Sequence, residues 1–107
     1  MKSLTVSKIL EVGEANRVAI TAPQRVPLSY SELRHHCKKI GRQLASQGLS
    51  NQSRVAIVMP NGPEMATAFL AVASYMSAAP LNPSYKKSEY EFYLKDLKPA
   101  LVIVAEN

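Results

Sequence analysis

The sequence is poor in the residues that build disulfide scaffolds and metal sites, with one cysteine and two histidines in 107 residues. A lone Cys37 excludes a disulfide-stapled fold and a four-cysteine zinc site. No uninterrupted apolar run approaches the roughly 20 residues that cross a bilayer. Residues 1–8 contain lysine but no apolar core segment, so they are not a secretory signal. These absences predict a protein of a reducing, cytoplasmic compartment with no membrane span.

Acidic residues are scarce as well, 8 against 13 lysines and arginines, which gives a net charge of +5. The basic side chains are densest on one expected helix, at Arg34, His35, His36, Lys38, Lys39 and Arg42. Such a cluster is typical either of a solvated helix face or of a surface for anions and nucleic acids. Nucleic-acid binding also needs aromatic residues among the basic ones, and this helix has none beyond Tyr30. We therefore expect a solvated face and no nucleic-acid partner.

The clearest local signal is the start of that helix. Ser29 is placed to cap it, and Glu32 falls at the third helical position, which makes a capping box. An apolar stripe follows at spacings of four, three and four, formed by Leu33, Cys37, Ile40 and Leu44. Gly48 is a plausible left-handed residue at the helix end. Cys37 lies in the stripe, which favours a packing role over a nucleophilic one. His35 and His36 are adjacent, so they cannot form the i, i+4 metal pair found on helices.

The remaining segments alternate between strands and helices. We expect a helix over 4–12, a strand over 17–21 and a turn between Pro23 and Pro27. From residue 54 onward the expected order is strand 54–59, helix 63–76, strand 78–81, helix 86–97 and strand 100–105. This alternation predicts an α/β fold, with a three-layer arrangement of helices around a parallel sheet joined by right-handed crossovers. Asn61 is the expected cap of the helix over 63–76. Ile57 and Phe69 are expected core residues.

No motif in the sequence points to catalysis. Phosphate-loop, dinucleotide-binding, zinc-protease and nucleophile-elbow patterns are all missing. Gly62 follows an apolar strand and opens a helix, as in some phosphate-binding turns, but Pro63 removes a donor and ordinary helix capping is favoured. Glu89, Glu91 and Asp96 are expected as surface charges on one helix. We therefore assign no catalytic, cofactor-binding or metal-binding residue in this chain.

The strand at 101–104 is apolar throughout and stands close to the end of the sequence. An uncovered apolar strand is an association hazard, so it needs a neighbour. Two partners are open at this point: the remainder of a larger parent chain, or another molecule that covers the strand in a self-associated form.

The order and wording of these segments resemble the start of the adenylate-forming (AMP-binding) superfamily, which includes acyl-CoA synthetases, peptide-synthetase adenylation domains and luciferases. The matching pieces are 17–20 (RVAI), 28–33 (LSYSEL), 48–49 (GL), 54–64 (RVAIVMPNGPE) and 79–85 (APLNPSY). Asn82 makes the last piece more similar to acid–CoA ligases than to peptide-synthetase domains, which tend to have Asp there. Residues 89–99 (EYEFYLKDLKP) look most like the oxalate–CoA ligase branch. One departure is Ser77, where the family usually has glycine.

The resemblance implies a two-step reaction for the parent enzyme. A carboxylic acid attacks the α-phosphate of ATP with Mg²⁺ present, and the thiol of coenzyme A then displaces AMP to form a thioester. In the family, the groups that contact the triphosphate come from later motifs, and none lies within residues 1–107. These residues therefore correspond to an N-terminal segment of the AMP-binding large domain, without the C-terminal domain. The parent's expected location is the cytoplasm or the peroxisome.

Two interpretations follow. In the first, the chain is the N-terminal fragment of an ATP-dependent acid–CoA ligase and is a scaffold, inactive alone; whether the chain itself counts as an enzyme stays open. In the second, it is a non-catalytic interaction or self-association module derived from a ligase.

Overall fold

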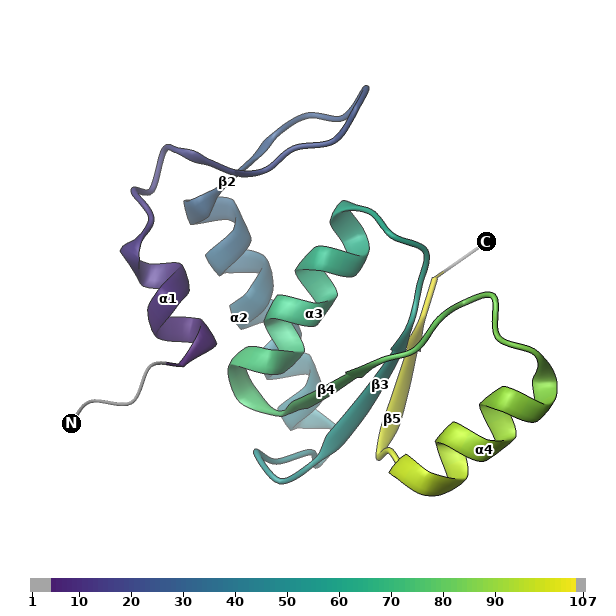
Figure 1. Cartoon of the computed structure of the whole chain (residues 1–107). Helices are drawn as coiled ribbons and strands as arrows, with labels where there is room; N and C mark the ends of the chain where they lie inside the picture. The colour runs from purple at the N-terminus through teal and green to yellow at the C-terminus, as the bar shows by residue number, and fades with distance from the viewer. Residues whose placement is uncertain (1–4, 106–107) are drawn as a thin grey trace.

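The computed structural model describes residues 5–105, which form four helices and five strands in two sheets within that range (Figure 1). The helices are α1 (Val6–Val12), α2 (Tyr30–Ser46), α3 (Pro63–Tyr75) and α4 (Lys87–Leu97). The strands are β1 (Val18–Ile20), β2 (Leu28–Ser29), β3 (Arg54–Val58), β4 (Ser77–Pro80) and β5 (Leu101–Val104). No helix in this range is long and apolar enough to cross a membrane.

The larger sheet has the strand order β4-β3-β5, and both pairings are parallel. Ala56 of β3 lies between Ala79 of β4 and Val102 of β5 in the register. Figure 1 shows α3 and α4 on opposite sides of this sheet, so the predicted α/β fold with a parallel sheet and helices on both faces is confirmed. The smaller sheet is the antiparallel pair β1-β2. The sequence analysis predicted β1 but not β2.

The core lies between the parallel sheet and the helix pair α2 and α3. Val55 and Ile57 of β3, with no exposed surface, pack there with Leu44 of α2 and Val72 of α3. A second cluster joins α1 to the other half of α2 through Leu10, Leu33, Cys37 and Ala71. The predicted apolar stripe of α2 therefore contacts both clusters, and Cys37 is a packing residue, as expected.

Both predicted ends of α2 are present. The Glu32 backbone N–H donates to Ser29 Oγ and the Ser29 N–H donates to Glu32 Oε1, both at 3.1 Å, so the capping box is formed. At the other end, Gly48 has a φ of 86° and its N–H donates to the Ala45 carbonyl, while the Leu49 N–H reaches the Leu44 carbonyl. This pair of bonds is a Schellman motif, which satisfies carbonyls that the helix end leaves free. Local sequence therefore sets where this helix begins and ends.

Arg34 departs from the expected solvated basic face. Its Nη1 donates to the carbonyl oxygens of Leu10 and Gly13, at 2.8 and 2.9 Å, and the contacts are partly buried. The guanidinium therefore satisfies carbonyls at the C-terminal end of α1 and joins that helix to α2. Nearby, the ring of Tyr30 lies against Gly13 so closely that a Cβ there would be 2.4 Å from a ring carbon.

The prediction for the start of α3 was wrong in one detail, and one core residue was misplaced. The cap is Gly62, not Asn61, and no side chain bonds to the free N–H groups as a cap. Phe69 was expected in the core, but it is 37% exposed. An almost wholly apolar helix has no polar stripe to mark its outer side, so periodicity did not separate Phe69 from Ala68 and Val72, which are buried.

The second face of the sheet is thinly covered. Helix α4 contributes no buried residue, and Phe92 on it is 66% exposed. Strand β5 is an edge strand, and its side chains alternate between partly buried Leu101 and Ile103 and exposed Val102 and Val104. The strand is therefore covered on one face only, by the core cluster, and open on the other.

We expect Ile57→Ala to lower the free energy of unfolding by about 2–5 kcal/mol, because it leaves a cavity in the core. Phe69→Ala should cost less, since that ring already contacts water. Lys39→Ala and His35→Ala, on the exposed side of α2, should each change it by less than about 0.5 kcal/mol. Urea titrations of the variants measure these differences. A Phe69 variant less stable than the Ile57 variant would show that the core is wrongly placed.

Candidate functional site

The carboxyl ends of β3 and β4 meet at one edge of the parallel sheet. The segment after β3 leads to α3 and the segment after β4 leads to α4, and these helices lie on opposite faces (Figure 1). Where neighbouring connections diverge in this way, a crevice opens between them, and ligands of open α/β sheets bind in such crevices. The edge between β3 and β4 is therefore the candidate functional site of the fold.

A groove of about 500 Å³ occupies this edge, which is within the range of small-molecule sites. We call it the carboxyl-edge groove. Its lining comes from the end of β3, the start of α3 and the loop after β4: Met59, Pro60, Asn61, Met65, Pro80, Leu81, Asn82, Pro83 and Ser84. The three prolines have no N–H to donate and restrict the backbone, so the wall is stiff and offers few hydrogen-bond donors.

The loop after β4 is held by its own polar contacts. Asn82 Oδ1 accepts a hydrogen bond of 2.8 Å from the Ser84 N–H, which is the turn expected from the sequence. The Tyr90 hydroxyl, from α4, donates to the Asn82 carbonyl at 2.7 Å. The ring of Tyr85 stacks on that of Tyr93 with centroids 5.1 Å apart, and desolvation raises the pKa of Tyr85. These contacts join α4 to the wall of the groove.

No side chain that lines the carboxyl-edge groove is ionisable. The groove can accept or donate hydrogen bonds through Asn61, Asn82 and Ser84, but it cannot donate or remove a proton. It also lacks the cations that a triphosphate needs and the carboxylates that Mg²⁺ prefers. Among residues 5–105 no three His, Cys, Asp or Glu side chains come together as a metal site. The lining of the carboxyl-edge groove therefore does not make a complete site for ATP or Mg²⁺.

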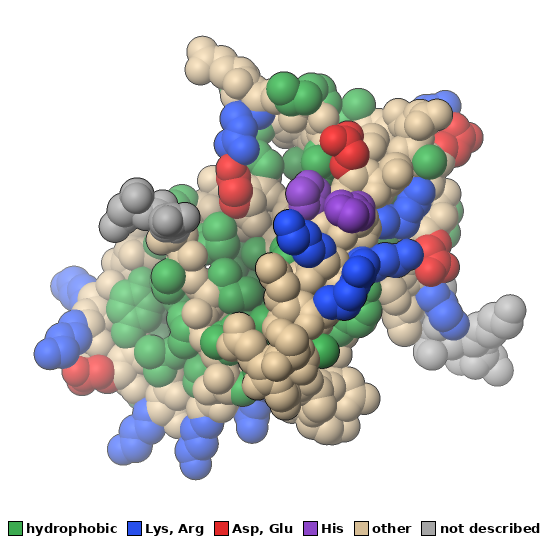
Figure 2. Space-filling view, turned by 180° about the vertical axis from the view of Figure 1, so that it is seen from behind, with side chains coloured by type: hydrophobic (Ala, Val, Ile, Leu, Met, Phe, Trp, Pro, Cys, Tyr) green, Lys and Arg blue, Asp and Glu red, His purple; other side chains and the backbone are tan. Residues whose placement is uncertain are grey.

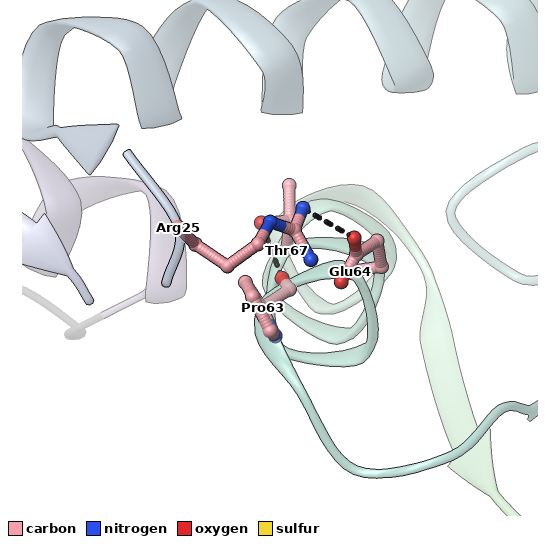
Figure 3. A network of polar contacts seen from close by, with 4 residues as sticks. All are labelled: Arg25, Pro63, Glu64 and Thr67. Carbon is pink, nitrogen blue, oxygen red and sulfur yellow. Dashed lines mark hydrogen bonds and ion pairs between the residues drawn. The ribbon is translucent and has the colours of Figure 1, made fainter. Parts of the chain in front are cut away.

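The start of α3 carries a carboxylate of the chain itself. The Glu64 carboxylate accepts a hydrogen bond of 2.6 Å from Arg25 Nη2 (Figure 3). The negative charge that suits the positive end of a helix is thus already supplied by the chain. Thr67 Oγ1 donates to the Pro63 carbonyl at 2.8 Å in the same network. A phosphate at Gly62 would meet the Glu64 carboxylate.

The other residues singled out from the sequence do not converge on the carboxyl-edge groove. His35 and His36 are exposed on α2, with ring centroids 6.1 Å apart at a large interplanar angle, and they appear together in Figure 2. Cys37 is buried among apolar residues, and this burial raises the pKa of its thiol. Glu89, Glu91 and Asp96 are exposed on α4, as predicted.

Comparison with known proteins assigns the family. Residues 11–107 match the AMP-binding enzyme family. A dimodular nonribosomal peptide synthase of Bacillus subtilis is 36% identical over 77 residues, which are 71% of this chain and 3% of that protein. An oxalate–CoA ligase of Arabidopsis thaliana is 32% identical over 112 aligned residues, 100% of this chain and 22% of that protein. The structure of apo MatB from Rhodopseudomonas palustris superposes with a TM-score of 0.84 at 23% identity, covering 94% of this chain and 21% of MatB.

The chain belongs to the AMP-binding family of adenylate-forming enzymes. Its relatives include both acyl-CoA synthetases and peptide synthetases, which confirms the resemblance to the superfamily. The chain spans less than a quarter of the length of the curated relatives described above, at 3% and 22%.

The contact between Arg25 and Glu64 was not predicted from the sequence. Arg25 and Glu64 are 39 residues apart, and no local pattern joins them. The lining of the carboxyl-edge groove, in contrast, can be inferred from the sequence, because the alternation of strands and helices around Asn61 and Asn82 implies a shared carboxyl edge.

We expect Glu64→Gln to reduce stability at neutral pH but not in acid. The Arg25 hydrogen bond lowers the pKa of Glu64, so the folded state favours the ionised carboxylate. This contribution is present above the ordinary carboxyl pKa and is lost as the pH falls below about 4. The difference in unfolding free energy between the wild type and Glu64→Gln should therefore shrink between neutral and acid pH. Denaturant titrations across that range measure it.

Glu91→Gln is the matched control, since Glu91 is an exposed helix glutamate with no ion pair in the described range. Arg25→Met should reproduce the Glu64→Gln result, because it removes the other half of the same pair. A Glu64→Gln difference that stays constant with pH would contradict the assignment of this carboxylate.

Proposed function

We propose that this chain is the N-terminal segment of the large domain of an ATP-dependent acid–CoA ligase, in which it acts as scaffold. The parent would activate a carboxylic acid as an acyl-adenylate and transfer it to coenzyme A, in the cytoplasm or the peroxisome. The observation that carries the scaffold role is the absence of any ionisable side chain in the carboxyl-edge groove. The groove offers walls and hydrogen bonds to a site whose charged groups come from other parts of the parent.

Asn82 supports a ligase that uses coenzyme A over a peptide synthetase, by its likeness to the acid–CoA ligases. In the turn, Asn82 uses only its side-chain oxygen, as the acceptor from the Ser84 N–H. A carboxylate oxygen of Asp would accept the same bond. The turn would therefore form with either Asn or Asp at this position. We take Asn82 as a mark of the kind of enzyme and not as a requirement of the turn.

The chain alone is expected to catalyse no ATP–pyrophosphate exchange with oxalate or with other carboxylic acids, because it lacks cations around a triphosphate. The assay uses the purified 107-residue chain, with the same column fractions from cells that lack its gene as the control. Exchange that co-elutes with the chain and is missing from the control would contradict the scaffold assignment.

Sequencing of the coding DNA beyond the Asn107 codon distinguishes a segment of a ligase from a gene product that ends at this residue. An open frame that continues into a Ser/Thr/Gly-rich loop with lysine supports the ligase. A stop codon at that point rules the ligase out for this gene product.

Self-association is the second candidate function, and the edge strand β5 is the observation that favours it. Val102 and Val104 are 41% and 64% exposed on the open face of β5. A second molecule that paired with this edge would cover the free backbone groups and place its own side chains beside the valines on the open face.

If the chain self-associates through β5, light scattering of the purified protein should give an average mass that rises with concentration from that of a monomer toward that of a dimer. Val104→Lys should return it to a monomer, because a charge on the edge strand opposes pairing. Val12→Lys is the matched control, since Val12 is 83% exposed at the far end of α1. A strict monomer at high concentration would exclude this function.

A further inference from the structure

A second hollow, of about 420 Å³, lies between α2, the start of α3 and the loop formed by residues 21–27. We call it the loop pocket. We propose that the loop pocket binds a small, uncharged, mainly apolar molecule that carries one hydrogen-bonding group. This proposal does not depend on the ligase function, because the groove at the carboxyl edge has a different lining.

The walls of the loop pocket are mostly apolar and come from five segments of the chain. The apolar residues of the lining are Ile20, Ala22, Val26, Leu28, Ile40, Pro63 and Ala68. Figure 2 shows hydrophobic side chains between the two histidines and a touching basic and acidic pair. A pocket of this volume with an apolar lining and a few polar groups has the usual character of a small-molecule site.

The polar groups of the loop pocket decide what charge the ligand carries. Arg25 and Glu64 both line it, but at 2.6 Å they neutralise each other. An anion would have to compete with Glu64 for the guanidinium, and a cation would have to compete with Arg25 for the carboxylate. His36 and the hydroxyl of Thr21 remain as polar groups of the lining, and each can donate or accept a hydrogen bond. An uncharged ligand with one polar group meets these conditions.

The loop above the pocket leaves an apolar side chain open to a ligand. Its turn is held by the Arg25 N–H, which donates to the Ala22 carbonyl at 3.2 Å, and Gln24 is left-handed with a φ of 60°. The side-chain contact that ties the loop to α3 is the Arg25–Glu64 pair, which is about half exposed. Val26 lines the pocket yet is 91% exposed. A bound apolar molecule would cover the side chain of Val26. The removal of this apolar surface from water would stabilise the complex.

Indole is a suitable probe, because it is uncharged, planar and apolar and has one N–H donor. Methyl NMR spectra of the purified protein should show shifts that saturate with indole concentration at Ile20, Leu28 and Ile40, and a matching shift at the His36 ring. Indole-3-acetate and tryptamine, which add a negative and a positive charge, should each bind about threefold more weakly than indole, because each competes with one partner of the half-exposed Arg25–Glu64 pair.

Val26→Ser tests the loop without disturbing the core, and we expect it to weaken indole binding by about fivefold through lost apolar contact. Val12→Ser is the matched control, because Val12 is also a highly exposed valine but lies outside the pocket. The Val12→Ser variant should bind indole as tightly as the wild type does. Shifts that do not saturate, equal weakening in both variants, or tighter binding of indole-3-acetate would each overturn the proposal.

Discussion

The fold depends on the hydrogen bonding of β3 along both of its edges. The two parallel pairings of the described chain, to β4 and to β5, share this one strand. Its residues Val55, Ala56 and Ile57 have no exposed surface, and no charged or polar side chain interrupts them. Removal of this strand would leave β4 and β5 without a partner and would remove Val55 and Ile57 from the core in which α3 packs. Everything that lines the carboxyl-edge groove is positioned from the end of β3 or of its neighbour β4.

What could be predicted from the sequence was what local chemistry determines. The capping box at Ser29 and the Schellman motif at Gly48 each depend on a few consecutive residues, and both are present. Ser77, which replaces the family's usual glycine, is tolerated because it has no left-handed backbone here: the positive φ values of non-glycine residues in the described range belong to Gln24 and Lys98. Strand β2 was missed, since it is only two residues long and exists through pairing with β1 across a loop.

At the candidate site, too, the local pattern could be predicted from the sequence and the long-range contacts could not. Alternation of strands and helices implies a carboxyl-edge groove at Asn61 and Asn82, but it does not say which polar groups are satisfied there. The Arg25–Glu64 contact joins two segments that no periodicity relates, and it holds at the start of α3 a carboxylate that would repel a phosphate. Helix α3 therefore separates two hollows at its first turn: Asn61 and Met65 face the carboxyl-edge groove, and Pro63 and Glu64 line the loop pocket.

Cys37 gives this chain an internal reporter of its own opening. It is the only thiol in the sequence, it is 3% exposed in the cluster that joins α1, α2 and α3, and burial raises its pKa. Alkylating reagents attack the thiolate, so the closed protein is protected both by access and by protonation. The rate at which iodoacetamide modifies the protein thus counts how often these three helices separate, with no label introduced.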